Sequence, residues 1–198
     1  MPKFKQSCLG YSFVLALIMS FMSLASQSEE TFVDVFNETS SWRFIGDSVM
    51  GGVSTGSIFF ETNEQGERTA CLNGSVSTAN NGGFIQMRKE INRSDREELK
   101  DVSAVVIEAR GNDEEYFIHI RTKGMLMPWT YYYVSFVATS EFREFVFPLD
   151  QFKRSGRFLG RNFPRGHELK SIGLVAFGKD YEAQLCSKKV SFLKPTDS

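Results

Sequence analysis

The fold of this chain is constrained most by short runs of β-branched and aromatic residues that alternate with turn residues along most of its length. Val, Ile, Phe, Tyr and Thr suit a half-buried pleated surface, and short runs of them are typical of an antiparallel sandwich or barrel. We therefore predict an all-β domain with strands at 31–36, 57–61, 69–78, 84–89, 102–110, 116–122, 130–139, 142–147, 171–177 and 184–193. Because the strands do not alternate with helices, a parallel nucleotide-binding sheet is not expected.

Two local signals interrupt the strand pattern. Residues 94–100 have helical character, with Ser94 as the expected N-cap and Glu97 as its capping-box partner. The sequence Asn-Asn-Gly-Gly at 80–83 predicts a tight hairpin turn between the two strands that flank it, because Asn-Gly supplies the positive φ angles that such a turn needs.

The N-terminus has the three parts of a secretory signal peptide. Lys3 and Lys5 precede an apolar run at 9–22, and small residues that suit a signal peptidase come directly after it. We expect a signal-peptide helix at 1–25 and a single exported domain at 26–198, either periplasmic or secreted. The alternative is an uncleaved segment, which would then be the chain's contact with a membrane.

The charge balance and the cysteines limit which partners and which compartment are expected. The chain has 23 Lys and Arg against 24 Asp and Glu, so nothing in its net charge favours nucleic acid. Cys71 and Cys186 remain after removal of the signal, an even number for an oxidising compartment. Both lie in predicted strands, and either a disulfide or two buried thiols would fit the sequence.

No segment has the residues of a catalytic, metal or cofactor site. The glycine-rich stretch at 46–56 lacks the Lys-Ser/Thr pair of a phosphate loop, and Ser54 does not lie on a nucleophile elbow. The acidic turn at 113–115 could ligate calcium, but it lacks the regular ligand alternation of an EF-hand and is better explained as a solvated turn. We therefore expect a protein that is not an enzyme and that needs no cofactor.

Aromatic residues give the strongest indication of a binding surface. By strand alternation, Trp129, Tyr131 and Tyr133 share one face of their strand. Three residues of the preceding strand also share one face and extend the same surface: Phe117, His119 and Arg121. Such a surface could stack on sugar rings or bind a protein partner, or the rings could simply cover the sheet.

Several motifs together resemble the complex I intermediate-associated protein family. The first signature consists of Trp42, Asp47, Val49, Met50, Gly51, Gly52, Ser54 and Gly56. It is followed in order by Gly74, Asn81, Gly82, Gly83, Phe84, Arg88, Gly111, Asp113, Tyr116, Arg121, Pro148, Phe152, Ile172 and Gly173. The similarity covers about residues 31–193. Two positions depart from it: the family often has Trp where Phe142 stands, and Gly-Asp-Gly where this chain has Gly111-Asn112-Asp113.

The resemblance implies a jelly-roll β-sandwich of the galactose-binding-domain-like type without enzyme activity. Mitochondrial members of this family are assembly factors for respiratory complex I, and wider relatives of the fold often bind carbohydrate. The interpretation favoured by the sequence is an exported, chaperone-like module that binds or assembles a protein partner. The alternative is a protein of the cell envelope that resembles a carbohydrate-binding module.

Overall fold

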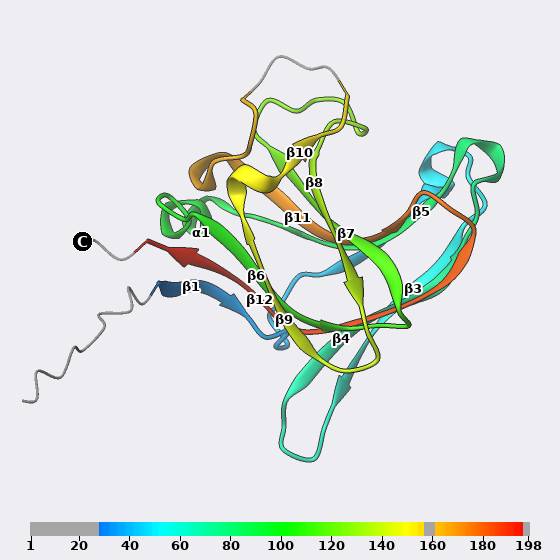
Figure 1. Cartoon of the computed structure of the whole chain (residues 1–198), viewed down its shortest axis with the longest axis horizontal. Helices are drawn as coiled ribbons and strands as arrows, with labels where there is room; N and C mark the ends of the chain where they lie inside the picture. Colours follow the sequence, from blue (N-terminus) through cyan, green and yellow to red (C-terminus); the bar gives the residue numbers. More distant parts are fainter. Residues whose placement is uncertain (1–27, 157–160, 196–198) are drawn as a thin grey trace, which may run out of the picture.

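The protein is a sandwich of two antiparallel β-sheets, as the strand pattern predicted (Figure 1). The computed structural model describes residues 28–156 and 161–195. The predicted signal segment at 1–25 therefore lies outside the described residues. No helix in the described ranges is both long enough and apolar enough to span a membrane.

Sheet A has six strands in which the long β12 occupies the centre. Its strands are β1 (Glu29–Asp34), β3 (Thr55–Thr62), β4 (Arg68–Val76), β6 (Ala104–Arg110), β9 (Arg143–Pro148) and β12 (Tyr181–Lys194). The order is β3-β4-β12-β6-β9, and β1 pairs with the C-terminal half of β12. In Figure 1, β1 runs beside the end of β12, and the β3–β4 hairpin projects away from the rest of the domain.

Sheet B also has six strands and carries the candidate site. Its strands are β2 (Arg43–Gly46), β5 (Phe84–Glu90), β7 (Glu114–Thr122), β8 (Tyr132–Ala138), β10 (Lys153–Arg154) and β11 (Leu169–Phe177). Their order is β10-β8-β7-β11-β5-β2, so strands distant in sequence become neighbours. The short helices are η1 (Asp47–Met50), η2 (Ala79–Asn81), α1 (Arg93–Glu98), η3 (Leu149–Gln151) and η4 (Gly166–Glu168).

The hydrophobic core lies between the two sheets. Alternate residues of β7, including Ile118 and Ile120, point inward and are fully buried. They form one cluster with residues of sheet A such as Leu72, Ile107 and Phe192. Because one face of sheet B packs on this core, its opposite face is free for another role.

The predicted hairpin at 80–83 was wrong. The turn at 80–83 joins β4 of sheet A to β5 of sheet B, so it is a crossing between sheets rather than a hairpin. The predicted positive φ angles do occur there, at Asn80, Asn81 and Gly83. Positive φ angles permit a sharp change of direction, but they do not require that the strands on either side pair with each other.

The helix begins one residue earlier than predicted and has a different cap. Asn92, not Ser94, accepts the hydrogen bond from the backbone N–H of Asp95. The Asp95 side chain in turn accepts from the backbone N–H of Asn92, so Asp95 takes the role that was predicted for Glu97. Asn ranks as high as Ser as a cap, so cap preference alone does not favour Ser94 over Asn92.

Cys71 and Cys186 form a disulfide within sheet A. They are directly opposed in the register of β4 and β12, and their Cα atoms lie 4.0 Å apart. The bond therefore links two neighbouring strands whose cysteines are 115 residues apart in sequence.

Candidate functional site

The buried carboxylate of Asp47 ties the first signature of the sequence to the turn at 80–83. Its Oδ1 accepts a hydrogen bond from the backbone N–H of Ser54, and its Oδ2 accepts from the Ser54 hydroxyl. Oδ2 also accepts from the backbone N–H groups of Gly83 (2.6 Å) and Phe84 (3.3 Å). Burial alone would raise the pKa of Asp47, but these hydrogen bonds outweigh it and lower the pKa below its ordinary value.

The glycines of the two motifs leave room for this carboxylate. A Cβ atom at Gly52 would lie 2.3 Å from Cγ of Asp47, and one at Gly82 would lie 2.4 Å from Oδ2. Any side chain at either position would displace the carboxylate from its donors. Asp47, Gly52, Ser54 and Gly82 therefore serve a structural role: they fix η1 against η2 at one end of sheet B.

Trp42, the first residue of the signature, is also structural. It is buried, and its Nε1–H donates to Asp34 Oδ2 at 3.1 Å. The same carboxylate forms an ion pair with Lys89 and accepts from the Phe36 backbone N–H. This network fixes the segment between β1 and β2 and does not reach the outer face of sheet B.

The outer face of sheet B holds a cleft of about 800 Å³. It extends over β2, β5, β11 and β7 to the residue before β8. The lining side chains are mostly aromatic, aliphatic or cationic: Arg43, Ile45, Val49, Met50, Asn81, Phe84, Gln86, Arg88, His119, Arg121, Pro128, Trp129, Tyr131, Ser171 and Phe177. A concave site of this size, with apolar walls and a few polar groups, is the usual form of a small-ligand site.

One wall of the cleft is aromatic. The rings of His119 and Tyr131 are stacked, with centroids 4.0 Å apart and an interplanar angle of 17°. Phe177 meets the His119 ring edge-on at 5.9 Å. Burial among these rings lowers the pKa of His119 to about 3, although part of the ring surface still reaches the cleft. His119 is therefore a neutral side chain at physiological pH.

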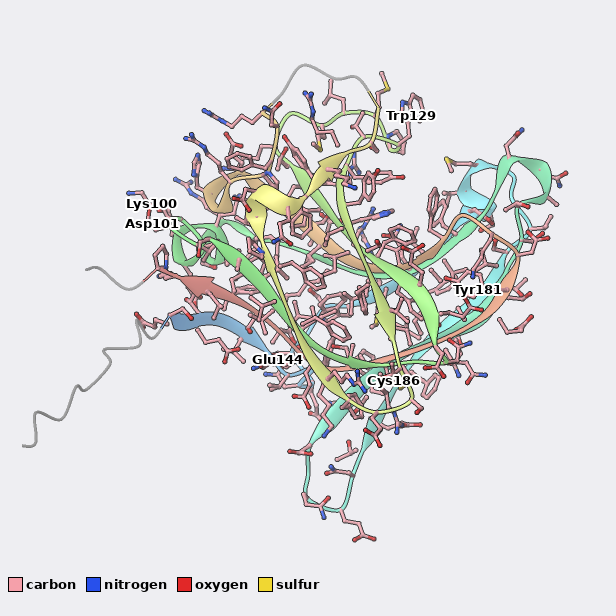
Figure 2. The ribbon with its side chains drawn as sticks, in the orientation of Figure 1. Lys100, Asp101, Trp129, Glu144, Tyr181 and Cys186 are labelled. Atoms are coloured by element: carbon pink, nitrogen blue, oxygen red, sulfur yellow. A yellow bond between two sulfur atoms is a disulfide. The ribbon has the colours of Figure 1, made fainter. Side chains whose placement is uncertain are left out.

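Trp129 stands on the loop between β7 and β8 at the rim of the cleft, as Figure 2 shows. Its side chain is 62% exposed, and Leu126 and Met127 of the same loop are also exposed. Arg121 holds this loop, because its Nη2 donates to the carbonyl oxygens of Met125 and Met127, each at 3.0 Å. A fixed, exposed Trp beside a cleft is a suitable surface for stacking.

The opposite rim consists of η1, which Asp47 fixes in place. Val49 and Met50 are exposed there and line the cleft. In Figure 1 the η1 and η2 turns lie at the upper right, near one end of β5, and the β7–β8 loop lies at the top. The first signature therefore shapes the cleft wall through Val49 and Met50, while its Gly52 serves the packing described above.

The structure divides the residues that the sequence selected for binding. Tyr131, His119 and Arg121 line the cleft together with Trp129. Phe117 and Tyr133 lie on the same face but outside the lining, where their ring centroids are 6.3 Å apart. Trp129 precedes β8 rather than extending it, so it belongs to the rim and not to a flat platform.

The lining residues that were not selected for binding include Arg43, Asn81, Gln86 and Arg88, of which Asn81 and Arg88 were named only in the motifs of the resemblance. Phe84, Gln86 and Arg88 alternate along β5, and this polar face was the available signal. Its importance depends on β11, which pairs with β5 on one side and β7 on the other. That long-range pairing cannot be read from the local pattern.

The described lining of the cleft offers aromatic faces and hydrogen-bond donors. Among the described residues, no carboxylate lines it, so an acid–base pair of the glycosidase type is not present in it. Nor do the described residues contain a group of three or more His, Cys, Asp or Glu side chains that could hold a metal ion.

The sequence profile of the complex I intermediate-associated protein 30 family matches residues 28–184. The chain belongs to this family. The match confirms the resemblance that the motifs indicated. The sequence matches no curated protein.

Solved structures similar to this member of the family include carbohydrate-binding modules. The family 11 module of the cellulosomal cellulase Lic26A-Cel5E of Clostridium thermocellum aligns with a TM-score of 0.69 at 10% identity, covering 87% of this chain and 99% of that module. A family 30 carbohydrate-binding module aligns at 0.51 and 10% identity, covering 73% and 76% of the two chains. An exo-β-agarase aligns at 0.51 and 9% identity, covering 86% of this chain but 26% of the enzyme. At identities this low the alignments establish the fold alone. They confirm the predicted jelly roll of the galactose-binding-domain-like type.

Proposed function

We propose that the protein is a non-catalytic binding module that holds carbohydrate in the cleft of sheet B. The observation that carries this proposal is the pairing of exposed ring faces with planar hydrogen-bonding groups in one cleft. Trp129 and the Tyr131–His119 stack offer apolar faces, while Gln86, Asn81 and the arginines offer donors. Sugar rings present apolar C–H faces and equatorial hydroxyls, which this combination complements.

The fold and the lining both support this proposal. The similar structures include carbohydrate-binding modules, one of them in complex with a β-1,3-1,4-mixed-linked tetrasaccharide. The lack of a carboxylate among the described lining residues supports binding without hydrolysis. The sequence favoured a protein partner over carbohydrate, and the cleft is the reason to place carbohydrate first.

The test is a binding screen with soluble oligosaccharides and a Trp129→Ala variant. We expect one class of oligosaccharide to bind and Trp129→Ala to weaken it by about tenfold, the effect of losing one stacking partner. Phe59→Ala is the matched control, because Phe59 is an exposed ring of sheet A far from the cleft lining. An absence of binding to any oligosaccharide at millimolar concentration contradicts the proposal.

A second function, protein binding in an assembly role, is supported by a different observation. The family is named for an intermediate of complex I, and exposed apolar side chains stand on both rims of the cleft, including Val49, Met50 and Leu126. Exposed apolar groups in one region often mark a protein interface. Cross-linking in the native envelope with Val49→Ser/Met50→Ser as the comparison tests this role: it requires a partner that the wild-type chain captures and the variant loses.

We further propose that the chain acts outside the cytoplasm. The N-terminal sequence supports export, and the Cys71–Cys186 disulfide suits an oxidising compartment. Cell fractionation and N-terminal sequencing test this: we expect a mature protein that begins near Ser26. A cytoplasmic protein that keeps residues 1–25 would contradict the proposal.

A further inference from the structure

The polar part of the cleft contains three arginines and is not neutralised by the protein. Arg43 on β2 is directly opposite Arg88 on β5, and Arg121 on β7 lines the same cavity. Like charges that face each other across a strand pair are destabilising. Together these residues form what we call the arginine triad: Arg43, Arg88 and Arg121.

A single carboxylate accompanies the arginine triad. Glu90 Oε1 lies 2.9 Å from Arg43 Nη2 and 3.3 Å from Arg88 Nε. Arg121 forms no ion pair within the described chain: it donates to two backbone carbonyls, and its buried Nε has no hydrogen-bond partner. Three positive charges against one negative charge leave the group with a net charge of about +2.

The surroundings show that this positive charge is concentrated rather than dispersed in solvent. The Arg88 side chain is only 19% exposed. Burial lowers its pKa, and the charges of Arg43 and Arg121 lower it further, against the opposing effect of Glu90. An anionic ligand would offset the repulsion between these guanidinium groups.

The strand between Arg88 and Arg121 leaves the triad accessible. Gly173 on β11 is opposite both Arg88 and His119 in the register, and Ser171 is opposite both Arg121 and Glu90. A Cβ at Gly173 would lie 2.8 Å from Gln86 Oε1, on the cleft side of the sheet. The small residues at these positions therefore open the floor of the cleft between the cations and the aromatic wall.

We propose that the cleft selects acidic carbohydrate, in which a sugar carries a carboxylate or sulfate group that the arginine triad binds. This inference rests on the proposed carbohydrate-binding function and names its ligand class. Guanidinium groups bind planar and tetrahedral oxyanions through paired N–H donors, and they do so more strongly than they bind neutral hydroxyls. The Tyr131–His119 stack and Trp129 remain available for the sugar ring itself.

The test compares charged polysaccharides with their own neutral forms on the purified protein. The probes are several uronate-containing polysaccharides, each paired with its methyl-esterified form, together with sulfated polysaccharides and neutral glucans. We expect at least one acidic probe to bind about tenfold or more tightly than its neutral counterpart, with the difference decreasing as salt is added. Preference for the uronate or the sulfated series identifies which anion the triad binds, and either preference supports the proposal.

Two substitutions in the triad and one outside it make the comparison specific. Arg88→Gln and Arg43→Gln should each weaken binding of the acidic form by a larger factor than binding of the neutral form, so that most of the preference for the acidic form is lost. Arg43 is 57% exposed, so its variant tests the proposal even if the partly buried Arg88 position affects folding. Arg143→Gln, at an exposed position on β9 of sheet A, should leave the preference unchanged.

The outcomes separate this inference from the proposed function. Equal affinity for the acidic and esterified forms overturns the charge selectivity and leaves carbohydrate binding intact. Failure of every carbohydrate, acidic and neutral, overturns both proposals. Binding of an acidic peptide such as polyglutamate without any carbohydrate binding overturns the assignment to sugars and identifies the triad as a protein-binding site.

Discussion

Replacing Asp47 with alanine removes one buried acceptor that four donors share. The groups left without it are the Ser54 hydroxyl and the backbone N–H groups of Ser54, Gly83 and Phe84. We expect the free energy of unfolding to fall by about 3 kcal/mol, measured by urea denaturation. Asp101→Ala, at an exposed acidic residue, should change it by less than about 0.5 kcal/mol. Similar losses in the two variants would contradict the structural role of Asp47.

Gly52 tests the same packing from the other side. Gly52→Ala places a Cβ against the Asp47 carboxylate, whereas Gly66→Ala introduces one where nothing lies within 4 Å. Gly66 has a φ of 81°, so its replacement costs about 1–2 kcal/mol through backbone strain alone. We expect Gly52→Ala to lower the thermal midpoint more than Gly66→Ala does. The reverse order would contradict the packing role of Gly52, since its φ does not lie in the left-handed region.

The buried imidazole of His119 makes stability depend on pH. Its pKa is lowered from 6.5 to about 3 in the folded protein, so the unfolded chain binds a proton first as the pH falls. Stability due to this residue is therefore complete above pH 6.5 and decreases below it, by up to about 1.4 kcal/mol per pH unit. His119→Phe should flatten the curve of unfolding free energy between pH 6.5 and about 4.5, before most carboxylates titrate. An unchanged slope would contradict the burial of a neutral imidazole.

The short helix α1 offers a test of its cap. Asn92→Ala removes the acceptor for the Asp95 backbone N–H and should destabilise the protein by about 1 kcal/mol. Ser94→Ala removes only a hydroxyl that donates to Asn92, so its effect should be a few tenths of a kcal/mol. The helix matters beyond its length because Glu98 accepts hydrogen bonds from Thr31 and Phe32 of β1. Both variants are compared by chemical denaturation of unglycosylated protein, since Asn92-Arg93-Ser94 is also an acceptor sequence for glycosylation. A larger effect of Ser94→Ala would contradict the cap assignment.

Most strands were predictable because they carry their own signal in the local sequence. Residues 116–122 alternate between core and outer face, and β7 follows that pattern from Tyr116 to Thr122. β2 and β10 were missed because strands of four and two residues are too short to show alternation. Their pairing comes from neighbours in the sheet and not from their own composition.

The assignment of each strand to a sheet could not be predicted in the same way. The turn at 80–83 has the residues of a hairpin, yet Asp47 binds its backbone and the chain crosses to the other sheet. Pairing between distant strands also explains why part of the cleft lining was not predicted. Arg43 and Arg88 approach His119 and Arg121 only because β11 lies between β5 and β7. Aromatic residues on one strand were recognisable, whereas the cations they face belong to distant segments.

The disulfide determines how the molecule as a whole resists unfolding. Cys71 on β4 and Cys186 on β12 are 115 residues apart in sequence, and the span between them contains most of sheet B and most of the cleft lining. Cross-linking so distant a pair reduces the conformational entropy of the unfolded chain, and we expect reduction to lower the free energy of unfolding by about 2–5 kcal/mol. The measurement is urea denaturation with and without reductant, and the Cys71→Ala/Cys186→Ala double variant is the control that should not respond. Binding to the cleft should survive reduction wherever the protein remains folded, because neither cysteine lines the cleft. Equal denaturation midpoints in both conditions would show that the bond does not stabilise the fold.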